Sequence, residues 1–192
     1  MKMTVFKMGA LSLLVGGTAM IPLAYAQTSS ATIPVQQVTD MLHAVMEADR
    51  TVYTQKVVNR LQNEEKVITA SEHFTDRKAL PLPAQMFRFG AERVAEKNKT
   101  FSYSLLSLWP INAQNAPRTP AEKAGLEAVN KDKTKPYYQE ETLGGKKYFT
   151  AVYADVAISP GCVSCHNEHI DTPRDDFKLN DVMGGVVIRV PL

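Results

Sequence analysis

YYQEETLGGKKYFTAVYADVAI, residues 137–158, is the part of the chain from which the fold class follows. Two segments rich in aromatic, hydroxyl-bearing and β-branched residues, Tyr137 to Leu143 and Lys146 to Ile158, flank the pair Gly144-Gly145. Such residues favour strands, and two glycines tolerate the positive φ angles that a two-residue hairpin turn requires. These residues therefore predict an antiparallel β-hairpin.

Two more segments would extend this hairpin into a small antiparallel sheet. Thr100 to Trp109 is rich in aromatic, hydroxyl-bearing and branched residues, and Pro110 ends it. Near the end of the chain, Gly184-Gly185 leads into Val186 to Val190, a final strand that can pair beside the hairpin. Residues 159–183 lack a regular pattern, so we expect an irregular loop before the last strand.

The helical signals lie mainly ahead of the hairpin. Apolar residues recur at spacings of three and four from Val35 to Gln62, which predicts one long amphipathic helix. A second helix is expected over Ala84 to Lys97, after two prolines. Thr119-Pro120-Ala121-Glu122 is a capping box that predicts a third helix ending near Val129. The expected fold is α+β, with a long N-terminal helix and further helices packed on a small antiparallel sheet.

The N-terminal residues 1–26 have the pattern of a secretory signal peptide. A basic start with Lys2 and Lys7 precedes an apolar run and the sequence Ala24-Tyr25-Ala26. An uncleaved anchor is the alternative, but glycines and a proline interrupt the apolar run, which is shorter than the ~20 residues that a membrane span needs. We therefore predict export to the periplasm, a domain spanning residues 27–192, and no stable membrane insertion after cleavage.

Composition excludes several kinds of partner. The 192 residues are 44% hydrophobic, enough for one domain with its own core. Loss of Lys2 and Lys7 lowers the Lys and Arg total from 22 to 20, equal to the 20 Asp and Glu residues. A neutral mature chain has no strong electrostatic attraction to nucleic acid or anionic lipid, so neither is expected as a partner.

Cys162-Val163-Ser164-Cys165-His166 is the motif that carries chemistry. It matches the pattern for covalent attachment of c-type haem. The two thiols can form thioethers with the two vinyl groups of one porphyrin, and His166 is then placed to bind iron as the proximal ligand. We therefore predict one haem c, attached through Cys162 and Cys165. Pro160-Gly161 would let the chain turn sharply ahead of the motif.

Two other uses of these residues remain open. The two cysteines, the only ones in the chain, could form a disulfide or a thiol oxidoreductase motif, although that class places its motif after an early strand and at the start of a helix. Zinc could bind Cys162, Cys165, His166 and His169, but the ligand spacing usual for structural zinc is absent. Expected export favours haem, because bacteria attach c-type haem outside the cytoplasm.

The mature chain resembles a bacterial family of c-type haem proteins with a PAS-like fold. Members occur as stand-alone periplasmic proteins and as extracytoplasmic input domains of sensor kinases and related receptors. The resemblance implies a PAS-like sheet with a long leading helix. The segments that carry it run in order along the chain: Tyr53–Val58, Pro81–Ala84, Ser107–Asn112, Asn115–Pro117, Cys162–Asn167, Asp181–Gly185 and Pro191–Leu192.

The distal side of the iron has no obvious ligand. The resemblance implies that some relatives use a cysteine on the first helix here, and the local pattern matches it to Tyr53. Tyr53 could bind ferric iron as tyrosinate or donate a hydrogen bond to a bound ligand. Met46, seven residues earlier, could bind as a thioether, although both side chains could simply pack in the core. His43 and His73 are expected in solvent, and His169 is too near the attachment motif to cross the ring.

These observations favour a periplasmic monohaem c-type cytochrome that binds or senses a small ligand, such as a diatomic gas, or redox state. A periplasmic electron-transfer cytochrome is the alternative, with a redox protein as partner, but carriers usually have a compact helical plan with the motif near the start. A peroxidase-like enzyme is a third reading. Because no acid–base pair stands out beside the motif, we do not expect an enzyme.

Overall fold

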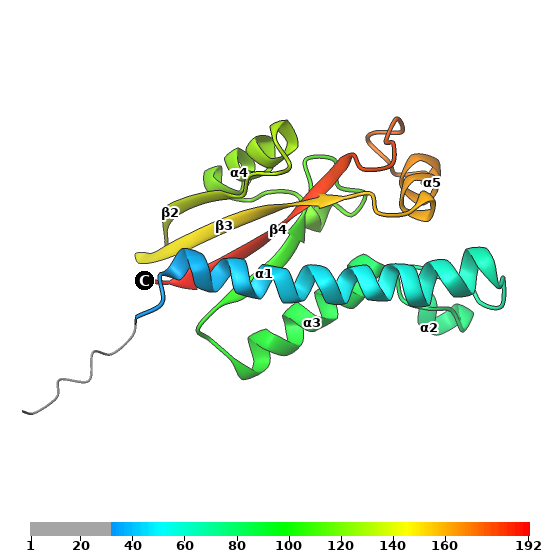
Figure 1. Ribbon diagram of the computed structural model, residues 1–192, viewed down its shortest axis with the longest axis horizontal. Coiled ribbons are helices and arrows are strands. Elements are labelled where there is room, and N and C mark those ends of the chain that lie inside the picture. The colour runs from blue at the N-terminus through cyan, green and yellow to red at the C-terminus, as the bar shows by residue number, and fades with distance from the viewer. Residues whose placement is uncertain (1–31) are drawn as a thin grey trace, which may run out of the picture. The chain divides into compact units, whose positions relative to one another are not determined.

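The computed structural model describes residues 32–192, so the expected signal segment lies outside the described residues. The chain forms a four-stranded antiparallel sheet with helices on both faces (Figure 1). The α+β prediction is confirmed, whereas the PAS-like classification stays a prediction. The elements in chain order are α1 (Val35–Val52), the π-helix η1 (Tyr53–Glu64), α2 (Phe74–Arg77), α3 (Pro83–Lys97), β1 (Ser102–Leu106), the 3₁₀ turn η2 (Ala113–Asn115), α4 (Pro120–Lys131), β2 (Tyr137–Leu143), β3 (Lys146–Val156), α5 (Pro160–Glu168) and β4 (Val182–Pro191).

The predicted hairpin forms at the predicted turn. Leu143 pairs with Lys146, and the two glycines between them have φ angles of 57° and 79°. These values belong to the left-handed region, which glycine enters without steric cost. The final strand β4 pairs with β3 on one side and β1 on the other, giving the order β1-β4-β3-β2.

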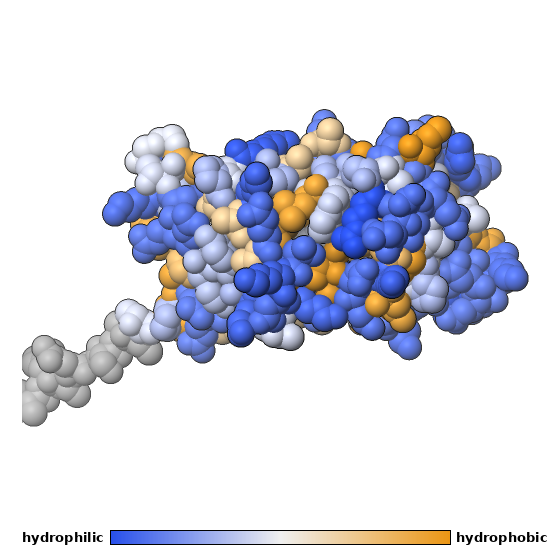
Figure 2. Space-filling view, turned by 90° about the horizontal axis from the view of Figure 1, so that it is seen from above, coloured by the Kyte–Doolittle hydropathy of each residue, from blue (hydrophilic) through white to orange (hydrophobic). Residues whose placement is uncertain are grey.

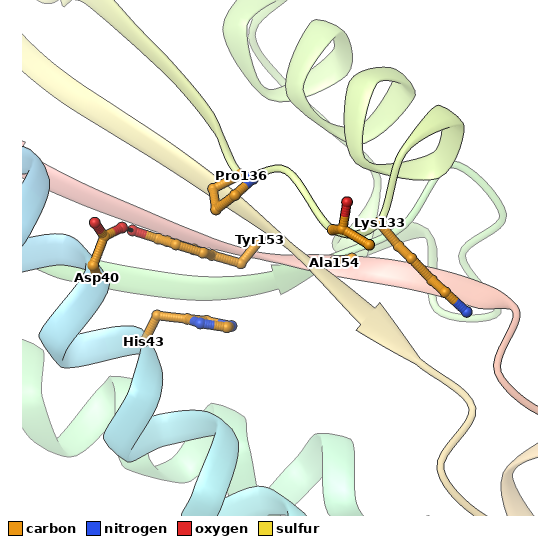
Figure 3. A pocket seen from close by; sticks show the side chains of 7 residues that line it. Asp40, His43, Lys133, Pro136, Tyr153 and Ala154 are labelled. Atoms are coloured by element: carbon orange, nitrogen blue, oxygen red, sulfur yellow. Dashed lines mark hydrogen bonds between the residues drawn. The ribbon is translucent and has the colours of Figure 1, made fainter.

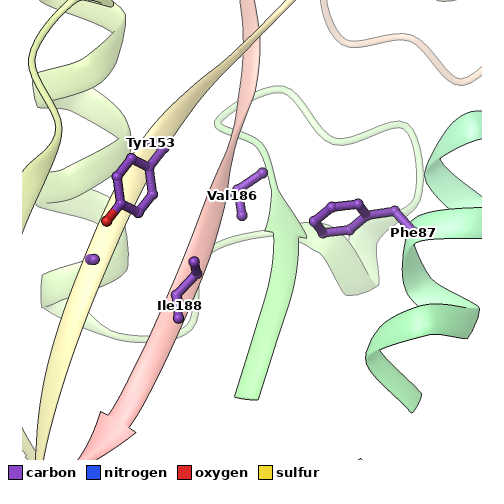
Figure 4. Packing of buried hydrophobic residues seen from close by; sticks show 5 residues of the cluster. Phe87, Tyr153, Val186 and Ile188 are labelled. Carbon is purple, nitrogen blue, oxygen red and sulfur yellow. The ribbon is translucent and has the colours of Figure 1, made fainter. Parts of the chain in front are cut away.

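The two faces of the sheet form separate parts of the core. On one face, Tyr153 of β3 and Val186 and Ile188 of β4 pack with Phe87, which α3 directs towards them (Figure 4). On the opposite face, residues of the same strands pack with Leu126 of α4. Alternation of side chains along a strand separates the two clusters. Helices α1 and α3 cover one face, and α4 covers the other (Figure 1).

The capping box of α4 forms as predicted and belongs to a buried ion network. Thr119 accepts a hydrogen bond from the Glu122 amide at 3.2 Å, and the Glu122 carboxylate accepts one from the Thr119 amide at 2.9 Å. The guanidinium of Arg189 on β4 donates to Glu122 and to Glu141 on β2, each at 2.8 Å. The network ties α4 to the sheet, because removal of Arg189 would leave two buried carboxylates unpaired.

The first helix extends from Val35 to Glu64, two residues beyond the prediction, but its hydrogen bonding changes within it. From Tyr53 onward it is a π-helix, and the Glu65 amide donates to the Arg60 carbonyl, five residues earlier, at 2.8 Å. Such segments are rare and often occur at functional sites. No helix within residues 32–192 combines the length and apolar character needed to cross a membrane.

The prediction of an irregular loop over residues 159–183 is wrong at its start. Helix α5 begins there, with Ser159 as its N-cap, accepting a hydrogen bond from the Cys162 amide, and Pro160 at the first helical position. Pro160-Gly161 therefore opens a helix and makes no sharp turn. The last strand also begins earlier than expected, at Val182. It includes Gly184, where a Cβ would overlap the Leu106 carbonyl, so glycine lets β1 approach closely.

Candidate haem-attachment site

Helix α5 presents the two cysteines of the motif. Cys162 and Cys165 are three residues apart on this helix, which places both thiols on the same face. Both thiols are free; Cys162 is half-buried, with its sulfur 3.3 Å from the Ser159 hydroxyl, and Cys165 is exposed. His166 follows directly on the helix. The helix thus brings together the three residues that the sequence predicted to attach haem.

The imidazole of His166 is in the form that binds a metal. Its Nδ1 is buried without a hydrogen-bond partner, and the ring meets the edge of Phe177 at a centroid distance of 6.0 Å. Burial, followed by the positive charges of Arg50 and His169, lowers the pKa of His166. The ring is therefore neutral at neutral pH, as a metal ligand must be.

An apolar wall stands beside the motif. Ala157, Phe177 and Met183 form a buried cluster, against which Cys162, Val163 and Trp109 pack. Trp109 meets Phe177 edge-on at 5.8 Å, and the Arg174 guanidinium lies within 4.5 Å of both ring centroids. These contacts make a hydrophobic boundary of the kind that surrounds a porphyrin.

Asn167, next to the proximal histidine, fastens the following segment to α5. Its amide nitrogen donates to the Phe177 carbonyl at 3.0 Å, and its amide oxygen accepts from the Phe177 backbone N–H at 3.1 Å. The paired bonds hold Phe177 against His166. Two thiols, a neutral imidazole with an unpartnered nitrogen and an apolar wall therefore fit a covalently attached haem.

The two candidates for the distal side have protein partners. The Tyr53 hydroxyl donates to the Pro81 carbonyl at 2.8 Å, and burial raises the pKa of this phenol, which disfavours tyrosinate. Met46 packs against the buried cluster that contains Phe87 and Tyr153. Within residues 32–192, no hydrogen bond or ring contact joins Tyr53 or Met46 to His166.

The remaining histidines lie in different surroundings. His43 is partly buried: its ring stacks on Tyr153 at 4.0 Å, Nε2 is enclosed without a partner, and burial lowers its pKa. The expectation that His43 lies in solvent is wrong, because this side of α1 faces β3. His73 is exposed as expected, and the Nε2 of His169 lies 3.9 Å from the Glu72 carboxylate.

Beside His43, residues of α1, of β3 and of the segment between α4 and β2 line an open hollow of about 340 Å³ (Figure 3). Asp40 lies at one end, accepting hydrogen bonds from the hydroxyls of Tyr138 and Tyr153 at 2.6 and 2.7 Å. Lys133 points away from Asp40 along β3 (Figure 3). The hollow contains none of the residues of the motif.

Seen from above, the surface of the molecule is mostly hydrophilic, and its apolar residues lie in several separate places (Figure 2).

The structure gives no support to the zinc alternative. Across residues 32–192, no group of three or more His, Cys, Asp or Glu side chains is arranged to hold a metal ion.

The structure also contains an ion pair that sequence patterns did not single out, between Arg50 on α1 and Asp155 on β3. These residues are 105 positions apart, and only the tertiary fold brings them together.

Two comparisons with known proteins lead to the same protein, Tll0287. The structure is similar to the crystal structure of the cyanobacterial heme protein Tll0287, with a TM-score of 0.54 and 13% sequence identity, over 83% of this chain and 97% of that one. At this identity the likeness concerns the fold. No curated protein matches the chain. The Tll0287-like family model matches residues 27–191. The chain therefore belongs to the Tll0287-like family.

Proposed function

We propose that this protein is an exported monohaem c-type cytochrome that binds or senses a small ligand, such as a diatomic gas, or the redox state of its compartment. The observation that carries the proposal is the arrangement on α5: two thiols on one helical face, followed by a buried, neutral imidazole. Membership of a family with a structurally similar haem protein supports the haem. Haem supplies an iron that changes oxidation state and binds diatomic molecules.

The residues of this chain have distinct roles in the proposal. Cys162 and Cys165 would hold the porphyrin through thioethers, and His166 would bind its iron. Phe177 and Trp109, which pack beside the motif, would keep water from the His166 imidazole. Tyr53 and Met46 remain the distal candidates, although each would have to leave its present contact to approach the iron. Because both side chains already have protein contacts, neither is committed to binding iron, and this is the reason to prefer ligand binding or sensing to electron transfer.

Export is part of the same proposal. The family match begins at Gln27, the residue that follows the expected signal segment, which supports a mature domain starting there. The periplasm is where we expect haem attachment and function. We propose a binding or sensing role and no enzymatic one.

Expression with the signal segment and the cytochrome c maturation machinery tests the proposal. We expect haem that stays with the denatured chain and a reduced spectrum that carbon monoxide shifts. Replacing both cysteines with alanine should release the haem, and His166→Ala should change the spectrum with the thioethers intact. Ser164→Ala, inside the same motif, is the matched control. A chain without covalent haem would refute the proposal, and a reduced spectrum unmoved by carbon monoxide would favour electron transfer.

A further inference from the structure

Arg50 is a buried cation with an unused hydrogen-bond donor. Its Nη1 lies 2.5 Å from the Asp155 carboxylate, and the side chains of the pair are only 14% and 13% exposed. Its Nε is buried without a partner. A buried polar group left unpaired destabilises a protein by about 1–3 kcal/mol. The ion pair with Asp155 keeps Arg50 buried although its Nε–H has no acceptor. We therefore expect a group outside the polypeptide to accept this hydrogen bond in the haem-bearing protein.

Asp155 holds the guanidinium in place from the sheet. It lies near the end of β3, where the pairing with β4 shifts register between Asp155 and Val156. Such irregularities bend a strand and redirect its side chains. The Arg50 carbonyl also accepts a hydrogen bond from the Thr54 hydroxyl at 2.7 Å, at the junction of α1 and η1. Arg50 is thus fixed at one edge of its guanidinium, with the edge bearing Nε left over.

Arg50 is anchored at the end of a strand that leads into the haem motif. Ala157, two residues after Asp155, is fully buried in the cluster that contains Cys162 and Val163. Helix α5 lies beside the C-terminal part of the first helix: a Cβ on Gly161 would come within 3.0 Å of the Asn63 side chain of η1 (Figure 1). Through its ion pair with Asp155, Arg50 is therefore held at the end of β3 that adjoins the motif.

We propose that Arg50 is the anion-binding residue of the haem site, using its Nε–H to bind an anionic acceptor at the haem. The inference rests on the proposed function and adds a residue to it. Two sources share this chemistry: a carboxylate of the porphyrin, or an anion bound to the iron. Arginine can bind either anion, because its planar guanidinium donates to Asp155 through Nη1 and still has the charged Nε–H donor free.

The test uses the haem-bearing protein and the variant Arg50→Lys, which keeps the charge and the reach to Asp155 but lacks Nε. Arg60→Lys is the matched control, since it makes the same substitution on the same helix at a side chain that is 47% exposed. Two quantities are measured: the fluoride affinity of the ferric protein by absorbance titration, and the midpoint potential by redox titration. A charge-assisted hydrogen bond of ordinary strength corresponds to about a tenfold change in affinity.

The two readouts separate the two sources. A loss of fluoride affinity of about tenfold in Arg50→Lys places the acceptor on the iron. An unchanged affinity, or no fluoride binding in either protein, together with a lower midpoint potential, places it on a porphyrin carboxylate, whose negative charge then favours ferric iron. Arg60→Lys should change neither quantity. If Arg50→Lys matches the wild type in both, the inference is wrong.

A second variant guards against misfolding. Where Arg50→Lys loses its native circular dichroism, Arg50→Gln combined with Asp155→Asn replaces the buried ion pair by a neutral pair, and the same changes in affinity or potential are expected from it. Wild-type protein that acquires no covalent haem would overturn the proposed function, and this inference with it. Haem-bearing wild type with unaffected Arg50 variants would overturn the inference alone.

Discussion

Phe177 should be a principal stabilising residue of the segment that follows the haem motif. Its side chain is only 3% exposed. Its ring contacts those of Trp109 at 5.8 Å and His166 at 6.0 Å, both edge-on, and the Arg174 guanidinium lies 4.3 Å from its centroid. The substitution Phe177→Ala would remove all of these contacts and leave a cavity against α5.

The expected cost follows from these contacts. Returning a buried phenylalanine to water costs about 1.5–3 kcal/mol. Each edge-on aromatic pair adds about 0.5–1.5 kcal/mol, and the partly exposed cation adds a little under 1 kcal/mol. Because neighbours relax into part of the cavity, the sum should fall within the roughly 3–5 kcal/mol range observed for buried Phe→Ala changes. We expect the free energy of unfolding to fall by about 4 kcal/mol.

Urea denaturation of the haem-free protein, followed by circular dichroism, measures this loss without contribution from the cofactor. Leu179→Ala is the control, because Leu179 lies in the same segment but is 51% exposed, and it should cost less than about 0.5 kcal/mol. A loss below about 1 kcal/mol for Phe177→Ala would refute the idea that this segment is packed on α5.

Three further results are expected. Gly184→Ala should lower the free energy of unfolding in urea by about 1–3 kcal/mol, because the added Cβ would press on the backbone of β1. Gly144→Asn, at a positive φ with open space around it, should be nearly neutral. Equal losses in the two variants would contradict the pairing of β1 with β4. Arg189→Met should cost about 3–5 kcal/mol, since both glutamate partners are buried, and a neutral outcome would contradict the network. Burial lowers the pKa of His43, so the contribution of this residue to stability is complete above pH ~6.5 and is lost as the pH falls below that value. The variant His43→Phe should therefore show a smaller drop in unfolding free energy between pH 7.5 and 5.5 than the wild type. An equal drop in both proteins would mean that other groups cause it.

Elements defined by local chemistry were predicted well. The hairpin follows from Gly144-Gly145, and α4 follows from a capping box whose two hydrogen bonds are both present. The long first helix follows from apolar periodicity, with its ends placed within two residues. In each case the deciding interaction joins residues close together in the chain, so sequence reasoning can detect it.

Helix α5 was missed although a local signal for it exists. Ser159-Pro160 has the same arrangement as Thr119-Pro120: a hydroxyl at the N-cap followed by proline at the first helical position. The same reasoning that found α4 would have found α5. Two features weaken the helical signal there: a glycine follows the proline, and no apolar periodicity continues through the segment.

Other parts of the site could not be predicted, because they depend on contacts between distant residues. The pairing of Arg50 with Asp155 requires α1 to cross β3, and no spacing within either element indicates it. His43 was expected in solvent because its position on the helix could be judged only against Tyr53. The stacking partner, Tyr153, lies on a strand more than one hundred residues later.

The position of the motif on a helix changes the comparison between a haem protein and a thiol oxidoreductase. A Cys-x-x-Cys pair at the start of a helix is where thiol oxidoreductases place their nucleophile, so one reason for setting that class aside no longer holds. Electrostatics at the second cysteine favour haem. A reactive thiolate needs a nearby cation, yet partial burial, followed by the negative charges of neighbours that include Glu72 and Glu168, raises the pKa of the Cys165 thiol. The adjacent His166 is neutral, so it supplies no cation either. An uncharged thiol beside an uncharged imidazole is a poor redox pair. Haem attachment, in contrast, converts the thiols to thioethers, and iron binds the neutral form of imidazole. The environment of Cys165 and His166 that weakens thiolate chemistry therefore favours haem.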